Sequence, residues 1–313
     1  MARVTLLVNP TSRKGRAGAA APHVAARLRE RGHEVSQVQG TDAEHAVGIL
    51  REVVDAGGAD AVVACGGDGT VHLALQVLAG SGIPLGIAAL GTGNDSATLL
   101  GVPTDPRAAA DVVADALDEG RVRVVDAGRA TSADGVQRWF LGVMSSGFDS
   151  VVNERANQMT WPSGQARYLR AILSVLRTFT PIPYEMVLDE GLDTEVRHTG
   201  LGMLVAVGNG SQYGGGMKVC PGARMDDGLL AVTFLDGLTK TRFLRVFPTV
   251  FSGRHVEQPE VHEHVARTVS LSAPGQIAYA DGERIGPLPV RIEVVRDAVR
   301  LLVPLADTRS ASA

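Results

Sequence analysis

Cysteine is rare in this chain: only Cys65 and Cys220 occur among its 313 residues. Their spacing matches no cysteine-based metal motif, so none is expected here. The sequence leaves a disulfide between the two open, but we expect reduced thiols, as in a cytosolic protein.

Long apolar runs and a strong charge bias are missing as well. No stretch of about 18 apolar residues occurs, so we expect no membrane-spanning helix. The opening MARVTLLVNP has too short an apolar run for a signal peptide, so we expect a cytoplasmic protein that can still visit a membrane surface. Thirty basic and 34 acidic residues give a net charge of −4, so the chain lacks the overall positive charge typical of a nucleic-acid-binding protein. Any anionic partner must therefore meet a local basic patch.

The remaining composition, 45% hydrophobic and 20% charged, is that of an ordinary soluble globular protein. A chain of this length has room for two domains. The first 126 residues alternate short β-branched runs with Ala/Leu-rich helical patterns. We expect strands at 4–8, 34–38, 61–64, 85–89 and 122–126, and helices at 18–31, 43–56, 71–79 and 106–119. This alternation predicts an α/β domain with a doubly wound parallel sheet.

The pattern changes after about residue 127, because strands then follow one another without regular helices between them. We expect strands at 139–143, 184–188, 200–207, 229–234, 268–271, 277–280 and 290–294, and helical inserts at 165–178 and 240–251. A mainly antiparallel β domain is predicted. The expected domains are 1–127, which a last segment 296–313 could rejoin, and 128–295.

Polar and glycine-rich loops follow the strands of the first domain. They are Asn9–Gly15, Gln39–Asp42, Gly66–Thr70 and Gly91–Ser96. In open parallel sheets the ligand binds outside the carboxyl ends of the strands, so these loops should line one site. Glycine loops before helices commonly hold phosphate, although a plain turn with Asp68 as a helix cap is the alternative. A Walker A motif is absent, and Gly91-x-Gly93 with Ser96 at the third glycine position matches the dinucleotide fingerprint only weakly.

The motifs together resemble the diacylglycerol/sphingosine lipid kinase family, with a narrower likeness to actinobacterial diacylglycerol kinases at 155–162. The residues that carry the resemblance are Asn9–Ser12, Gly66–Thr70, Gly91–Asp95, Val125–Gly128, Gly147–Asp149, Gly208–Gly210, Gly214–Met217, Pro221–Leu230 and Asp281–Glu283. The resemblance implies an ATP-dependent kinase of a lipid hydroxyl, with ATP between an α/β domain and a C-terminal β-sandwich. It assigns the nucleotide to Asn9, Pro10, Thr11, Ser12, Arg13, Thr41, Gly66, Gly67, Asp68, Gly69, Thr70 and Thr92, with His72 and Asn94 as further candidates.

The sequence departs from the family at His72-Leu73, where many relatives have Asn-Glu. His72 could replace a polar contact to the nucleotide or lie on the solvated side of its helix. Leu73 cannot replace a carboxylate.

Carboxylates near the strand ends suggest Mg²⁺, which prefers oxygen ligands and bridges phosphates in phosphoryl transfer. Asp68, Asp95 and Asp126 each lie at or just beyond the expected end of a strand, although each could instead cap a helix. The resemblance adds a second, structural Mg²⁺ site at Arg224, Asp227 and Leu229. Asp226 could compete for that role, and an Asp-Asp-Gly turn is the alternative.

Asp281-Gly282-Glu283 taken alone predicts a hairpin turn. Within the family pattern we expect Asp281 to be the general base that accepts the lipid hydroxyl proton. Glu283 could act in its place or orient it, since residues i and i+2 of an extended segment share a face.

Two segments, 167–179 and 242–255, combine apolar residues at helical spacing with arginines. They could simply pack on the β domain, or one could dock on an anionic membrane through Arg167, Arg170 and Arg177. The favoured reaction is phosphorylation of diacylglycerol to phosphatidic acid, at the inner face of the membrane, by a chain that could form a homodimer. A sphingoid base, ceramide, monoacylglycerol or NAD as acceptor, and a non-catalytic nucleotide-binding regulator, stay open.

Overall fold

The computed structural model describes residues 1–9, 16–91, 93–159, 161 and 165–304. The chain divides into two compact units, one formed by Met1–Val125 with Asp297–Ala313 and the other by Asp126–Arg296. Strands β5 (Arg123–Ser132) and β15 (Val290–Leu302) each contain a boundary between the units. Within the described ranges no helix is long and apolar enough to cross a membrane.

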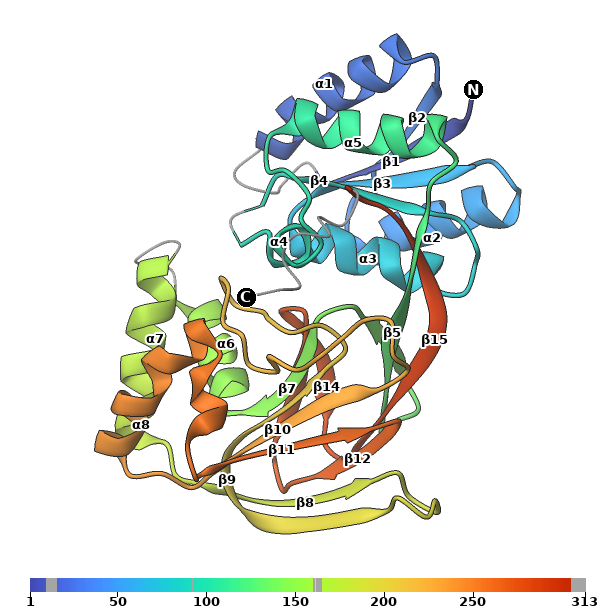
Figure 1. Cartoon of the computed structure of the whole chain (residues 1–313). Coiled ribbons are helices and arrows are strands. Elements are labelled where there is room, and N and C mark those ends of the chain that lie inside the picture. Colours follow the sequence, from blue (N-terminus) through green and yellow to red (C-terminus); the bar gives the residue numbers. More distant parts are fainter. Residues whose placement is uncertain (10–15, 92, 160, 162–164, 305–313) are drawn as a thin grey trace. The chain divides into compact units, whose positions relative to one another are not determined.

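The first unit is built on a parallel sheet in the order β15–β4–β3–β1–β2 (Figure 1). Its strands are β1 (Arg3–Val8), β2 (Glu34–Val38), β3 (Ala61–Gly66), β4 (Leu85–Ala89) and the end of β15. Its helices are α1 (Arg16–Glu30), α2 (Ala43–Asp55), α3 (Asp68–Leu78), α4 (Asp95–Leu99) and α5 (Pro106–Asp118). Helices α1 and α5 cover one face and α2 and α3 the other, which is why every residue of β3 is buried.

Local signals fix where two of these helices begin. The Asp42 side chain accepts a hydrogen bond from the His45 amide at the start of α2. The Asp105 side chain accepts from the Arg107 and Ala108 amides at the start of α5, where Pro106 occupies the first turn. Both are capping arrangements that satisfy amides left without intrahelical partners.

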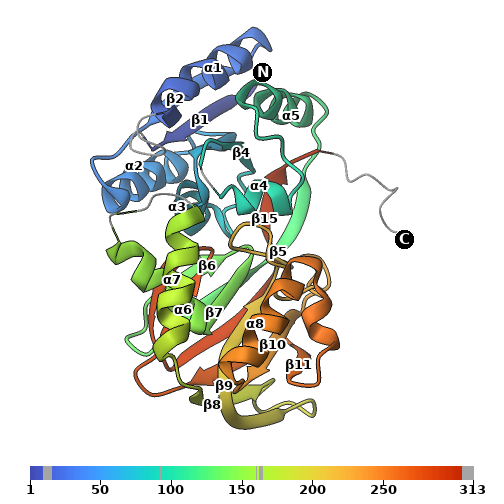
Figure 2. The same cartoon turned by 90° about the vertical axis from the view of Figure 1, so that its left-hand side faces the viewer.

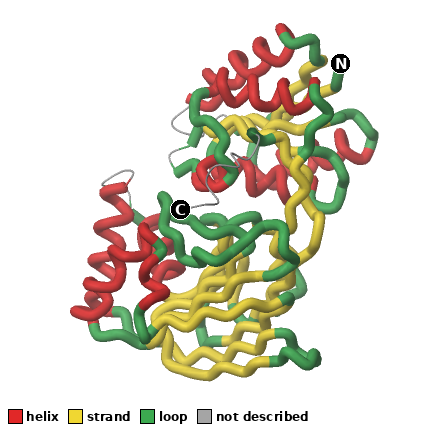
Figure 3. Tube along the Cα trace, viewed as in Figure 1, coloured by secondary structure: helices red, strands yellow, loops and turns green. Residues whose placement is uncertain are grey.

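The second unit is mainly antiparallel, and Figure 3 shows strands dominating it. Its strands are β6 (Gln137–Phe140), β7 (Val143–Gly147), β8 (Ile182–Leu188), β9 (Val196–Gly208), β10 (Leu230–Asp236), β11 (Val261–Ala266), β12 (Thr268–Ser272), β13 (Ile277–Ala280) and β14 (Glu283–Pro287), with parts of β5 and β15. The strand order is β14–β13–β7–β9–β8–β12–β15, with β10 and β11 added beside β9 and β5 and β6 beside β15. Tyr184, Phe140 and Phe234 are fully buried in its core.

Three helices pack together on this unit: α6 (Phe148–Gln158), α7 (Gln165–Thr178) and α8 (Lys240–Val246). The Phe148 ring lies 4.7 Å from that of Phe243 on α8, and Ala156 and Val175 belong to the same apolar cluster. After α8 the chain continues as 3-10 segments at Phe247–Ser252 and Arg254–Glu257. The expected helix 240–251 is thus shorter, because Pro248 has no amide to continue the α-helical ladder.

The predicted fold class, a parallel α/β domain followed by a β-rich domain, is confirmed. Several elements differ from expectation. The strand expected at 139–143 is two strands separated by Leu141–Gly142, and the strand expected at 290–294 continues to Leu302. Helices α4 and α6 and strands β11 and β14 were not predicted. Both cysteines are buried free thiols, as expected.

Candidate functional site

Loops of the first unit meet at one edge of its parallel sheet. The Asn9 amide, just after β1, donates to the Cys65 carbonyl of β3 (3.4 Å). The Leu90 amide, just after β4, donates to the Gly66 carbonyl (2.7 Å). The segments that follow β1, β3 and β4 are therefore side by side, as the parallel arrangement predicts.

Two glycine motifs are packed directly against each other at this edge. Strand β3 runs through Gly66 and α3 already begins at Asp68, so the connection is shorter than the expected loop 66–70. A Cβ on Gly66 would lie 2.0 Å from Thr70 Oγ1, and a Cβ on Gly91 would lie 2.5 Å from Gly67 Cα. Only glycine permits this approach, which brings the two helix starts together.

Asp68 and Asp95 face the same small space. Each is the first residue of its helix, α3 or α4. Asp68 Oδ1 accepts a hydrogen bond from the Ser96 amide (2.9 Å). A Cβ built on Gly93 would lie 3.1 Å from Asp68 Oδ2 and 3.4 Å from Asp95 Oδ2. The absence of a side chain at Gly93 thus keeps open a space between two carboxylates, which suits a divalent cation with water as further ligands.

Thr70 and Asn94 contribute buried oxygens beside these carboxylates. Thr70 Oγ1 and Asn94 Oδ1 make no hydrogen bond to any residue that the structure describes. Asn94 has a left-handed backbone (φ 56°) as the residue before α4. Such oxygens are ready acceptors for a ligand or an ordered water.

His72 is buried, with 6% of its surface exposed. Its Nε2 lies 3.3 Å from Gln76 Nε2, and Gln76 Nε2 also donates to the His72 carbonyl (3.1 Å). The alternative that placed His72 on the solvated side of its helix is therefore wrong. A contact between His72 and the nucleotide stays a prediction.

The remaining nucleotide candidates differ in how far the structure describes them. Thr41 is exposed, and its hydroxyl donates to Asp42 Oδ2 (3.2 Å) and lies 3.0 Å from His45 Nδ1, at the start of α2. Asn9 is half-buried and Gly69 lies in the first turn of α3. Pro10, Thr11, Ser12, Arg13 and Thr92 lie outside the described residues.

Asp126 does not lie where the sequence suggested. It is inside β5, which continues to Ser132, and it belongs to the second unit, whereas Asp68 and Asp95 belong to the first. Its side chain is 3% exposed, and Oδ2 accepts a hydrogen bond from the Gly228 amide (2.8 Å). The expectation of a strand end at Asp126 is wrong because the apolar pattern continues into the next domain.

The turn beside Asp126 contains the predicted structural Mg²⁺ residues. Asp227 Oδ1 accepts a hydrogen bond from the Leu229 amide (2.9 Å), and Gly228 has a positive φ of 72°. Arg224 pairs with Asp226 (3.3 Å) at the exposed side of the same turn. The Asp-Asp-Gly turn is thus present, and cation binding there stays a prediction. Across the described residues no group of three or more His, Cys, Asp or Glu side chains is arranged to hold a metal.

Asp281 and Gly282 form the two-residue turn between β13 and β14, with φ values of 51° and 87°. Positive φ at both positions is typical of a type I′ hairpin turn, for which Asp-Gly is a preferred sequence. Glu283 is the exposed first residue of β14 and pairs with Ala280. The idea that Asp281 and Glu283 share one face of an extended segment is wrong, because the turn separates them.

The Asp281 carboxylate binds the backbone between β6 and β7. Its Oδ2 accepts from the Leu141 amide (2.8 Å), and Oδ1 accepts from the Gly142 (2.9 Å) and Val143 (3.2 Å) amides. Hydrogen bonds from amides stabilise the ionised form of a carboxylate. These three hydrogen bonds fix the orientation of the carboxylate.

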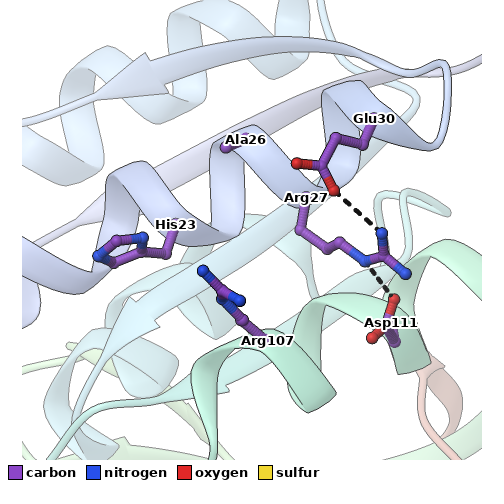
Figure 4. Close-up of a pocket in the computed structure, with 6 residues that line it drawn as sticks. All are labelled: His23, Ala26, Arg27, Glu30, Arg107 and Asp111. Carbon is purple, nitrogen blue, oxygen red and sulfur yellow. Dashed lines mark hydrogen bonds and ion pairs between the residues drawn. The ribbon is translucent and has the colours of Figure 1, made fainter.

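Each unit also has a groove, and neither is lined by the predicted nucleotide, metal or base residues. In the first unit, α1 and α5 flank a groove of about 310 Å³ lined by His23, Arg27 and Arg107 (Figure 4). Arg27 is already paired with Glu30 and Asp111, and the groove contains none of the predicted site residues.

The groove in the second unit lies between α6 and α7, which pack side by side (Figure 2), and has a volume of about 640 Å³. Arg155, Arg170 and Arg177 line it together with Leu173, which is 57% exposed. Within the described ranges none of the three arginines pairs with an acidic side chain. Arg155 was missed because α6 was missed.

Comparison with known proteins identifies the class. A family profile for the diacylglycerol kinase catalytic domain matches residues 3–130, and one for the YegS C-terminal NAD kinase beta sandwich-like domain matches residues 142–303. The chain is 45% identical over 303 residues to the diacylglycerol kinase of Mycobacterium tuberculosis, covering 96% of this chain and 95% of that protein. It is 29% identical over 275 residues to the "Probable lipid kinase YegS-like" of Citrobacter koseri, covering 84% and 83%.

Solved structures agree on the fold. Two crystal structures from Bacillus anthracis, one titled a diacylglycerol kinase, match 97% of this chain and 98% and 97% of theirs, with TM-scores of 0.76 and 0.69 at 22% and 20% identity. The relative that is 45% identical over 96% of this chain shows that the chain belongs to the diacylglycerol kinase family. It is a lipid kinase, and membership of a kinase family implies ATP as its co-substrate.

Proposed function

We propose that this enzyme transfers the γ-phosphate of ATP to the free hydroxyl of diacylglycerol, giving ADP and phosphatidic acid. The observation that carries the proposal is the pair Asp68 and Asp95, which face each other across Gly93 between two glycine motifs. The name of the Mycobacterium tuberculosis relative supports diacylglycerol as the acceptor.

The first unit would hold the nucleotide. Asp68 and Asp95 would bind Mg²⁺, directly or through water, and the glycine motifs would let backbone amides approach the phosphates. Mg²⁺ supplies charge neutralisation for the transferring phosphoryl group. Thr70 Oγ1 and Asn94 Oδ1, which no described residue satisfies, would accept hydrogen bonds from the bound nucleotide or its waters.

The second unit would supply the base. Asp281 would accept the lipid hydroxyl proton, with its carboxylate held in one orientation by three amides. Glu283 is the second candidate for this role. The turn at Arg224, Asp227 and Leu229 would bind a structural Mg²⁺, and Asp126 would hold that turn through the Gly228 amide.

The α6–α7 groove would contact an anionic membrane. Arg155, Arg170 and Arg177 provide positive charge that is not neutralised within the described ranges, and exposed Leu173 provides apolar surface beside it. Trp161 is 74% exposed, and the Arg170 guanidinium lies 5.7 Å from its ring centre. Arginine with an exposed aromatic and an aliphatic side chain suits the headgroup region of a bilayer.

An acceptor panel tests the reaction. Purified protein with labelled ATP and Mg²⁺ is offered diacylglycerol, monoacylglycerol, ceramide and sphingosine in mixed micelles, and NAD in solution. Labelled phosphatidic acid as the main product is expected. Phosphorylation of NAD alone would rule out a lipid acceptor, and phosphorylation of nothing would favour a nucleotide-binding regulator.

Vesicle co-sedimentation tests the membrane contact separately. We expect Arg155→Gln, Arg170→Gln and Arg177→Gln together to lower binding to phosphatidylglycerol vesicles at least tenfold. A control that replaces exposed Arg138, Arg197 and Arg291 by Gln carries the same change in charge and should bind like the wild type. Equal loss in both triple variants would show a general charge effect and contradict a docking groove. Displacement by millimolar inorganic phosphate would instead indicate a site for the free anion.

A further inference from the structure

A half-buried acid that the proposed reaction leaves without a role lies in the Gly147-Phe148-Asp149 motif. Asp149 is in the first turn of α6. Its Oδ2 accepts a hydrogen bond from Tyr213 OH (2.7 Å) and another from Ser145 Oγ on β7. Its Oδ1 is buried and makes no hydrogen bond to a described residue. One carboxylate oxygen thus joins a strand, a helix and the loop that contains Tyr213.

Tyr213 fixes one end of a glycine turn. The Tyr213 and Met217 backbones exchange both of their hydrogen bonds, at 3.1 and 2.9 Å. Between them Gly214, Gly215 and Gly216 all have positive φ, at 62°, 80° and 91°. Three consecutive glycines provide no Cβ that could limit the backbone, so the turn depends on its ends, and the phenol of Tyr213 anchors one of them.

The same loop lies against the backbone that holds Asp281. The Asn209 and Gly210 amides donate to the Gly142 carbonyl, at 2.9 and 2.8 Å. A Cβ built on Gly142 would lie 2.7 Å from Asp281 Oδ1 and 3.5 Å from the Gln212 carbonyl oxygen. The loop 209–217 and the Asp281 carboxylate therefore both contact Gly142.

Strand β7 contacts both Asp281 and Asp149. The Val143 amide donates to Asp281, and Ser145, two residues further on the same face of the strand, donates to Asp149. Ser145 also pairs across the sheet with Tyr279, two residues before Asp281.

Placing the charged carboxylate of Asp149 at this position costs free energy of folding. Burial raises the pKa of Asp149 despite its hydrogen bonds from Ser145 and Tyr213. Apolar groups of similar volume are often as stable as a buried charged network or more stable, so such a network is better explained by a requirement for one defined geometry.

We propose that Asp149 is a positioning residue, which holds the 209–217 loop against Gly142 through Tyr213 and thereby sets the surroundings of Asp281. The catalytic part of this inference rests on the proposed function, because it takes Asp281 as the base of the kinase reaction. The positioning part concerns the loop alone.

The test compares Tyr213→Phe with Tyr184→Phe. Both variants lose one phenol hydroxyl from the same unit, but only Tyr213 donates to Asp149. We expect Tyr213→Phe to lower kcat for lipid phosphorylation about tenfold with the KM for ATP changed less than twofold. Tyr184→Phe should leave kcat unchanged, and the melting temperatures of the two variants should be similar. Asp149→Asn combined with Tyr213→Phe should lower kcat no further than the larger single effect, since both break one interaction.

Hydrogen exchange separates the two parts of the inference. Amides of residues 209–217 should exchange at least tenfold faster in Tyr213→Phe than in the wild type or Tyr184→Phe, a readout that needs no activity. Equal protection in all three proteins would overturn the positioning of the loop. Faster exchange with unchanged kcat would overturn the link to Asp281 while the proposed lipid kinase reaction stands. A wild type that phosphorylates no lipid would remove the proposed function, and the exchange rates would still decide the role of Asp149.

Discussion

Asp68 in the first unit and Asp281 in the second are both carboxylates beside a glycine, yet they are held in opposite ways. Asp68 is the first residue of a helix, and its Oδ1 accepts a hydrogen bond from the Ser96 amide. Its Oδ2 faces the space beside Gly93 that Asp95 Oδ2 also faces. Asp281 lies in a hairpin turn, and both of its carboxylate oxygens accept hydrogen bonds from backbone amides. The first arrangement keeps a charged oxygen available to a cation, whereas the second fixes one carboxylate in one orientation. This difference supports a cation-binding role for Asp68 and a base role for Asp281.

Replacing Asp281 should have the largest effect. We expect Asp281→Asn to lower kcat at least a hundredfold, because an amide cannot accept the hydroxyl proton. Its NH₂ group would also face backbone donors, which should destabilise the unit by about 1–3 kcal/mol. Radiolabel transfer and a thermal melt measure both effects. Glu283→Gln is the matched control, and a larger loss there than in Asp281→Asn would reverse the two roles.

Filling the space between Asp68 and Asp95 should have the next largest effect. We expect Gly93→Ala to lower kcat/KM for Mg²⁺·ATP about tenfold, because the new methyl would lie 3.1 and 3.4 Å from the two carboxylates. The control is Gly48→Ala, inside α2, where a Cβ would meet nothing within 4 Å. That control should leave kinetics unchanged and stabilise the protein by about 0.5–1 kcal/mol. Normal Mg²⁺ dependence in Gly93→Ala would contradict a cation between these acids.

Asp149, whose Oδ1 atom is buried, predicts a smaller, pH-dependent effect on stability. Because burial raises its pKa above the ordinary 3.8, the folded state binds this proton more tightly than the unfolded state. The wild type therefore loses stability relative to Asp149→Asn as pH rises from about 4 through the folded pKa. Melting temperatures of the two proteins between pH 4 and 8 should show that the difference shifts steadily in favour of the variant. A constant difference would mean that Asp149 does not titrate abnormally.

The smallest effect should be the reactivity of the two thiols, because we expect almost no alkylation of either in the native protein. Burial raises the pKa values of Cys65 and Cys220 to about 12, and both side chains are fully buried. Less than one thiol in ten should react with iodoacetamide in an hour at pH 8 in the native protein, and both should react after denaturation. Rapid native labelling of one thiol would mean that its unit opens readily.

The first unit could be predicted well because its signals are local. Each glycine motif directly follows an apolar strand, and parallel strands bring such segments to one edge. The contact between Gly91 and Gly67 and the orientation of Asp68 toward Asp95 depend on side-chain packing, which the spacing of motifs does not contain.

The second unit could be predicted only in class, because its key contacts are distant in sequence. Asp281 binds amides 138–140 residues earlier, at a strand break that looked like continuous strand. Tyr213 donates to Asp149, which is 64 residues earlier in the chain. Asp149 lies on α6, whose polar sequence FDSVVNERANQ gave no clear helical pattern. The strand that contains Asp126 was predicted to end there, although β5 continues into the second unit.

Titration of Mg²⁺·ATP binding to Asp95→Asn and Asp281→Asn, by calorimetry without lipid, tests the division between the two carboxylate sets most directly. Asp95→Asn should weaken Mg²⁺·ATP binding about tenfold, whereas Asp281→Asn should bind it within twofold of the wild type and still transfer no phosphate to diacylglycerol. Equal weakening of binding in both variants, or full turnover by Asp281→Asn, would contradict the separate roles assigned to the two units.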